Sequence, residues 1–121
     1  MRSVAIAKPE LAPYGAAALE TLQRMGLWKR IEAKVVYAQN ISMARQYAAS
    51  GNADAVFTAY SLVFRESGTI VRVDEALHRP IDQVAGIVAR SKHQDAARRF
   101  TAYLLSGEGK ALLREFGYQT Q

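Results

Sequence analysis

Two loops of this 121-residue chain carry the residues best suited to hold a small anion. Each joins a strand-like run to a helix-like run: one spans Lys8–Gly15 (KPELAPYG) and the other spans Gln39–Met43 (QNISM). A helix start presents unpaired backbone N–H groups and a partial positive charge, so it can bind an oxyanion without a charged side chain. We therefore expect the N–H groups of Tyr14 and Ile41 to point into one shared crevice.

Small and polar neighbours in the same loops could assist such binding. Gly15 would let the backbone approach a ligand closely. Asn40 or Ser42 could cap the second helix or donate a further hydrogen bond. Because every connection from a strand to a helix must begin a helix somehow, the same residues also fit a helix start with no ligand. The two loops alone leave both interpretations open.

The elements that position these loops alternate between strand and helix over the first sixty residues. The hydrophobic patterns predict strands at Ser3–Lys8, Lys34–Ala38 and Asp54–Tyr60, with helices at Pro13–Met25 and from Asn40 or Ile41 to Gly51. This order with short connections implies a parallel sheet with right-handed crossovers. In such sheets the loops at the carboxyl ends of the strands converge where the strand order reverses, so both loops are predicted to meet there.

The second half of the chain is predicted to hold two more strands and a helical tail. The runs Thr69–Val73 (TIVRV) and Gln83–Ala89 (QVAGIVA) favour strands, whose partners the sequence leaves open. Ser91 with Gln94 forms a predicted capping box at the start of one helix, and Ser106 is a predicted cap for the last.

Composition argues against several other functions. Sixteen basic and eleven acidic residues give a formal net charge of +5, but the basic residues are spread along the chain, which favours solvated helix faces over a nucleic-acid interface. Cysteine is absent, and His78 and His93 lie far apart without a metal-binding or catalytic motif. We therefore expect no metal site, no cofactor and no enzymatic activity.

A family resemblance rests on motifs along nearly the whole chain. The run Val4–Gly15, followed by Ala18-Leu19 and Gly26-Leu27-Trp28, resembles the "IANPEHAPYG…AL…GLW" signature of molybdate-binding proteins of ABC importers. The similarity continues in order through Asn40–Ser42, Ser50–Ala55, Pro80–Ile81, Ser106–Gly109 and Phe116–Tyr118. The separate pieces are common, whereas their order and spacing together are specific.

The resemblance implies an α/β fold: a single lobe of the type II periplasmic-binding fold, with a mostly parallel sheet flanked by helices and a C-terminal helical tail. Residues 1–90 would form the anion-binding lobe. Residues 91–121 would form the tail, which in the family packs on a first lobe. We expect this chain to begin where the family's chain crosses into its second lobe, so the serine and threonine loops of the first lobe would lie outside it.

The resemblance also implies a ligand and its donors. In the family, molybdate or tungstate is held wholly by hydrogen bonds, and the second lobe gives the N–H of a residue in the Pro-Tyr-Gly motif and that of the aliphatic residue in an Asn-aliphatic-Ser motif. These positions are Tyr14 and Ile41 here. Some members add a tyrosine hydroxyl near the end of the third strand, where the aligned residue is Thr58, with a shorter hydroxyl.

The implied function is that of a partial substrate-binding component of an ABC transporter, with a small oxyanion and the transporter's membrane subunit as partners. One alternative is a stand-alone lobe that dimerises through its tail and has a vestigial site or none. Another is a cytoplasmic regulatory domain that senses an anion. We expect the periplasm if a signal peptide belongs to a longer chain upstream of Met1, and the cytoplasm otherwise.

Overall fold

The structure is a computed structural model that describes residues 1–120. It divides into two compact units, Met1–Ile81 and Asp82–Gln121, so the first unit ends before the predicted boundary between residues 90 and 91. The first unit contains the sheet and its covering helices, and the second contains two helices.

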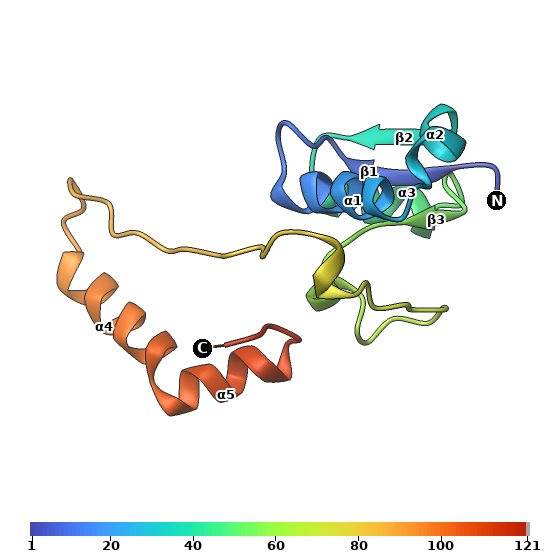
Figure 1. Cartoon of the computed structure of the whole chain (residues 1–121). Helices are drawn as coiled ribbons and strands as arrows, with labels where there is room; N and C mark the ends of the chain where they lie inside the picture. Colours follow the sequence, from blue (N-terminus) through green and yellow to red (C-terminus); the bar gives the residue numbers. More distant parts are fainter. Residues whose placement is uncertain (121) are drawn as a thin grey trace. The chain divides into compact units, whose positions relative to one another are not determined.

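A three-stranded parallel sheet forms the centre of the first unit (Figure 1). Its strands are β1 (Val4–Ala7), β2 (Val35–Ala38) and β3 (Ala55–Val56), in the order β2-β1-β3. All four residues of β1 are buried, as expected for a central strand covered on both faces. The predicted βαβαβ order is confirmed, although β3 is shorter than the predicted strand at Asp54–Tyr60.

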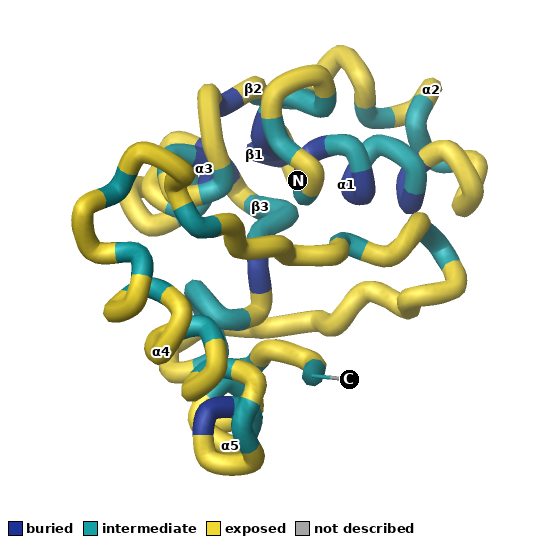
Figure 2. Tube along the Cα trace, turned by 90° about the vertical axis from the view of Figure 1, so that its left-hand side faces the viewer, coloured by how far each residue is buried: buried dark blue, intermediate teal, exposed yellow. Residues whose placement is uncertain are grey.

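Helices cover the two faces of the sheet separately. Val4 and Ile6 pack in a cluster with Ala18 of α1 (Pro13–Arg24), whereas Ala5 packs in a second cluster with Ala44 of α3 (Ile41–Ala49). Because successive strand residues point to opposite faces, α1 and α3 lie on opposite sides of the sheet. Figure 2 shows the buried positions gathered on β1 and on the inner sides of these helices.

Short helices follow α1 and β3 in the first unit. Proline at the first position of α1 fits the predicted helix start, and Gly26 has φ of 68° just after the helix, where a residue with a side chain would be strained. The helices α2 (Trp28–Ile31) and η1 (Glu32–Lys34) lead into β2. After β3 come η2 (Tyr60–Leu62) and η3 (Glu75–Leu77).

Two strand predictions were wrong. Within residues 1–120, neither Thr69–Val73 nor Gln83–Ala89 forms a strand. Val71 is 80% exposed and Val84 is 94% exposed, so these side chains have no core to cover. A run rich in β-branched residues becomes a strand only where a neighbouring strand and a packed face are present, and the three-stranded sheet extends to neither segment.

The second unit contains α4 (Gln94–Leu105) and α5 (Gly107–Glu115). Ser106 caps α5 as predicted, because its Oγ accepts a hydrogen bond from Gly109 N at 3.1 Å. The predicted capping box at α4 is wrong: no side chain caps that helix, and the Gln94 side chain donates instead to the carbonyl of Ala89. Gly109 is buried where the backbones of α4 and α5 meet.

Candidate anion-binding site

The three strands end at one edge of the sheet. Ala7 of β1 is paired with Ala38 of β2, and Lys8 N extends this pairing with a 2.8 Å hydrogen bond to the carbonyl of Ala38. On the other side Ala5 pairs with Val56, and Phe57 N extends this pairing with a 3.0 Å hydrogen bond to the carbonyl of Ala5, so Thr58 follows directly after the paired residues. The loops that lead into α1 and α3, together with Thr58, therefore leave the sheet at this carboxyl edge, as predicted.

The loop before α1 is closed by its own backbone. Leu11 N and Ala12 N both donate to the carbonyl of Lys8 at 3.0 Å, and Gly15 N donates to the carbonyl of Ala12 at 3.0 Å. Tyr14, at the second position of α1, is half-buried and takes part in an interaction within the chain. The role of its N–H as an anion donor stays a prediction.

Gly15 has a structural reason to be glycine. A Cβ built at this position would lie 2.0 Å from the carbonyl oxygen of Ala7 and 2.7 Å from its carbon. The first turn of α1 therefore rests directly against the end of β1, and any side chain at position 15 would collide with strand backbone. This packing explains the glycine without a ligand, and the close approach to a ligand that we expected there stays a prediction.

The start of α3 presents two open donors. Asn40 caps the helix, because its Oδ1 accepts from Met43 N at 2.8 Å and its carbonyl accepts from Ala44 N at 3.0 Å. The N–H groups of Ile41 and Ser42 have no acceptor among the residues that the structure describes. Both lie at the positive end of the helix dipole, where an anion is stabilised. Ser42 is exposed and Ile41 is half-buried, so this helix start is accessible.

Thr58 adds a hydroxyl at the same edge. Its Oγ1 is buried and has no hydrogen-bond partner within residues 1–120. Leaving a buried hydroxyl unpaired costs about 1–3 kcal/mol, so native structures rarely keep one without a water or a ligand. Val56 packs in the cluster on the α3 side of the sheet, and strand alternation places Thr58 on that side too if the extended backbone continues.

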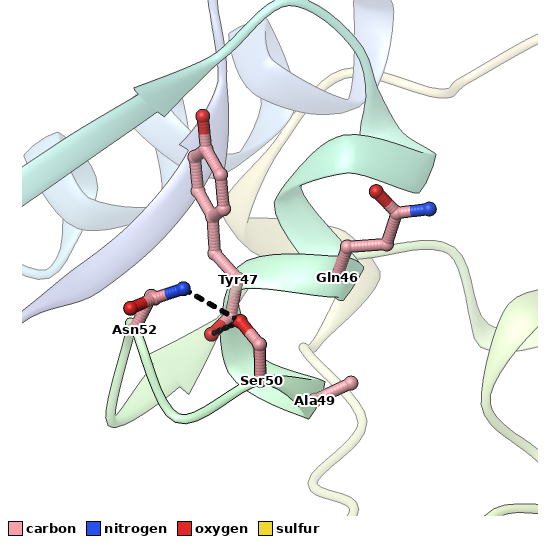
Figure 3. Close-up of a pocket in the computed structure, with 5 residues that line it drawn as sticks. All are labelled: Gln46, Tyr47, Ala49, Ser50 and Asn52. Carbon is pink, nitrogen blue, oxygen red and sulfur yellow. Dashed lines mark hydrogen bonds between the residues drawn. The ribbon is translucent and has the colours of Figure 1, made fainter.

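A separate hollow lies at the C-terminal end of α3, away from the carboxyl edge of the sheet (Figure 3). It is open and is lined by Gln46, Tyr47, Ala49, Ser50 and Asn52. Asn52 Nδ2 donates to Ser50 Oγ at 2.8 Å, and Ser50 Oγ donates to the carbonyl of Tyr47 at 3.3 Å. The side chains of Ser50 and Asn52 thus bond within the hollow, and none of the five lining residues is charged.

Comparison with known proteins identifies the family. Residues 1–119 match the model of the bacterial extracellular solute-binding protein family. The chain belongs to this family. It is 38% identical to the molybdate-binding protein ModA of Rhodobacter capsulatus, over 100% of this chain and 48% of that protein. It is also 34% identical to the molybdate-binding protein ModA of Azotobacter vinelandii, over 99% of this chain and 49% of that protein.

Solved structures of solute-binding proteins share the fold. The periplasmic molybdate-binding protein of Azotobacter vinelandii matches with a TM-score of 0.89 and 27% identity, over 99% of this chain and 55% of that one. The substrate-binding domain of a putative molybdenum ABC transporter from Clostridium difficile matches with a TM-score of 0.77 and 30% identity. That match covers 99% of this chain and 53% of the other. The predicted resemblance and fold class are confirmed, and the chain spans about half the length of the curated relatives it matches.

One charged residue near the candidate site was not singled out from sequence. Arg45 lies on α3 one turn after Ile41, and its Nη2 contacts Oε1 of Glu66. Arg45 Nε is buried and has no hydrogen-bond partner in the described part of the chain. Spacing of four residues along the helix could have indicated Arg45, but its partner Glu66 lies 21 residues away and only the fold reveals it.

The other charged groups with shifted pKa values serve the scaffold of this family member. Backbone N–H groups of Arg2 and Ser3 donate to Asp54 just before β3 and lower the pKa of its carboxyl. Arg79 N donates to Glu20 at 2.9 Å and lowers the pKa of that carboxyl, helped by Arg24. Neither carboxyl comes from the loops at the carboxyl edge. No cluster of metal-ligating residues and no helix able to span a membrane was found among residues 1–120.

Proposed function

We propose that this chain is one lobe of an ABC-importer solute-binding protein and contributes half of a site for a tetrahedral oxyanion, molybdate or tungstate. The observation that carries the proposal is the pair of open amides at Ile41 and Ser42. They begin a helix at the carboxyl edge of the sheet, in a chain whose relatives include proteins named for molybdate binding.

The proposed chemistry is hydrogen bonding without proton or electron transfer. A tetrahedral dianion has four oxygens that accept hydrogen bonds. This lobe offers the open N–H groups of Ile41 and Ser42 and the hydroxyl of Thr58, and the N–H of Tyr14 is a further predicted donor. Asn40 holds the start of α3 in place through its cap on Met43. The remaining donors would come from a second lobe, which corresponds to the part of the relatives that this chain does not span. Discrimination against sulfate would then follow from the size of the closed cavity.

Titration by nuclear magnetic resonance tests this function. With half of the donors, this chain alone should bind molybdate with a dissociation constant of about 1 mM or weaker. Amide shifts during a molybdate titration of the ¹⁵N-labelled chain should concentrate at Ile41 and Ser42. Submicromolar binding by a monomer would contradict the half-site. Shifts that avoid both amides throughout the titration would contradict the location.

The transporter context forms part of the same proposal. The relatives include a putative ABC transporter substrate-binding lipoprotein of Bacillus subtilis (strain 168), 30% identical over 98% of this chain and 46% of that protein. We infer that the whole protein acts outside the cytoplasmic membrane, delivers its oxyanion to a membrane subunit and catalyses no reaction. Uptake of molybdate by cells with and without the gene would test this inference.

A second candidate function is self-association through the second unit, and exposed apolar side chains favour it. Phe100 and Leu105 of α4 are 63% and 68% exposed, and Leu112 of α5 is 42% exposed. Such side chains on a short helical hairpin tend to find another apolar surface. Light scattering after size exclusion would show a dimer if a second copy covers them. A strict monomer at high concentration would remove this candidate.

A further inference from the structure

A salt bridge lies beside the proposed half-site. Nη2 of Arg45 contacts Oε1 of Glu66, and the two side chains are 33% and 43% exposed. The buried Nε of Arg45 donates to no acceptor among residues 1–120, so the pairing with Glu66 leaves part of the guanidinium unsatisfied. Glu66 belongs to the turns that follow η2, far along the chain from α3.

The spacing along α3 brings this pair close to the open amides. Residues four apart on a helix share a side, with Cβ atoms about 5–6 Å apart, so the Arg45 side chain starts from the same side of α3 as Ile41, one turn along. An anion at that amide would feel both the guanidinium and the carboxylate that neutralises it. The field at the site therefore depends on the balance between these two charges.

We propose that the Arg45–Glu66 pair sets the strength of dianion binding at the start of α3. Arg45 supplies the counter-charge, and Glu66 cancels most of it. The inference rests on the proposed function, because it assigns a role relative to that site. Removing the carboxylate would leave a full positive charge beside the ligand, whereas removing the guanidinium would leave a negative charge that repels it.

A purely structural role for the pair predicts a different outcome. If the salt bridge only attaches the turn at Glu66 to α3, breaking it from either side should loosen the same contact and change binding in the same direction. An electrostatic role predicts opposite directions for the two substitutions. It also predicts a free-energy change twice as large for a dianion as for a monoanion of the same shape, because the Coulomb energy is proportional to ligand charge.

The experiment compares Glu66→Gln, Arg45→Gln and the double variant by titration at low ionic strength, followed at the Ile41 and Ser42 amides. Molybdate is the dianion, and perchlorate is a tetrahedral monoanion. Glu66→Gln should tighten molybdate binding about threefold to eightfold at about 10 mM ionic strength, and perchlorate binding only by about the square root of that factor. Arg45→Gln should weaken molybdate binding by a similar factor, and the double variant should return close to the original affinity.

Glu32→Gln is the matched control. It makes the same change in net charge, but Glu32 lies in η1 before the amino end of β2, and the strand of about 13 Å separates it from the edge where α3 begins. It should change molybdate affinity much less than Glu66→Gln does. Circular dichroism of each variant shows whether it is folded, and exposed salt bridges of this kind contribute little to stability.

The outcomes separate this inference from the function on which it rests. If no anion shifts the Ile41 and Ser42 amides in the original chain, the proposed function fails. If anions do shift them, the inference fails when Glu66→Gln and Arg45→Gln change affinity in the same direction. It also fails when molybdate and perchlorate respond equally, or when Glu32→Gln matches Glu66→Gln.

Discussion

The contact between α1 and β1 makes Gly15→Ala the most informative single substitution for the scaffold of the site. The added Cβ would lie 2.0 Å from the carbonyl oxygen of Ala7, about 1 Å closer than real Cβ atoms approach other atoms. The strand cannot move easily, because Ala7 is buried in the centre of the sheet and pairs in register with Ala38. Either α1 must lift away from the sheet or the strand must shift.

The magnitude follows from two opposing effects. Overpacking costs about 1–3 kcal/mol and occasionally more, and a collision with central-strand backbone belongs at the upper end. Alanine gains back up to about 1 kcal/mol over glycine in a helix. A net loss of about 2–3 kcal/mol is a large part of the roughly 5–15 kcal/mol that stabilises a small domain.

Urea unfolding followed by Trp28 fluorescence measures this loss in the first unit. Trp28 is the single tryptophan of the chain and packs on the cluster on the α1 side of the sheet. Ala16→Gly is the control, because it makes the reverse change one position along and should cost at most about 1 kcal/mol. A Gly15→Ala protein within about 0.5 kcal/mol of the original would refute the packing explanation of this glycine.

Three further predictions concern individual contacts at and below the site. Asn40→Ala removes the cap of α3 and should lower stability by about 0.5–2 kcal/mol in urea unfolding, whereas Asn40→Asp should keep most of it. Thr58→Val removes a buried hydroxyl without a partner, so it should leave stability unchanged or raise it by about 1 kcal/mol while weakening the molybdate-induced shifts of α3. The folded-state pKa of Asp54 is lowered by the N–H groups of Arg2 and Ser3, so its contribution to stability is complete above the unfolded pKa and is lost as the pH falls through the folded pKa. Asp54→Asn should therefore flatten the decline of the melting temperature on acidification, and an unchanged acid profile would contradict the assignment.

Local patterns were sufficient to predict the part of the fold from which the proposed half-site is built. The strands β1 and β2, the helices α1 and α3 and their glycine-terminated ends all follow from periodicity, proline and glycine within a few residues. The Asn40 cap was one of the two alternatives offered for the start of α3. Connections this short constrain the strand order, so the parallel sheet and its carboxyl edge could be placed without knowledge of distant contacts.

The features that were missed or mispredicted depend on residues distant in the chain. Thr69–Val73 has the composition of a strand, but strand formation needs a partner edge that no local pattern reports. The packing constraint on Gly15 was missed, because it comes from the carbonyl of Ala7, whose closeness only the fold reveals. The charge of Arg45 was visible in the sequence, but its neutralisation by Glu66 was not. Residue type and spacing thus indicate which groups could bind an anion, whereas tertiary contacts determine which groups are already occupied. At the proposed half-site those contacts leave the amides of Ile41 and Ser42 open and place the Glu66 carboxylate against Arg45, so the donors should provide the binding and the ion pair should adjust its strength.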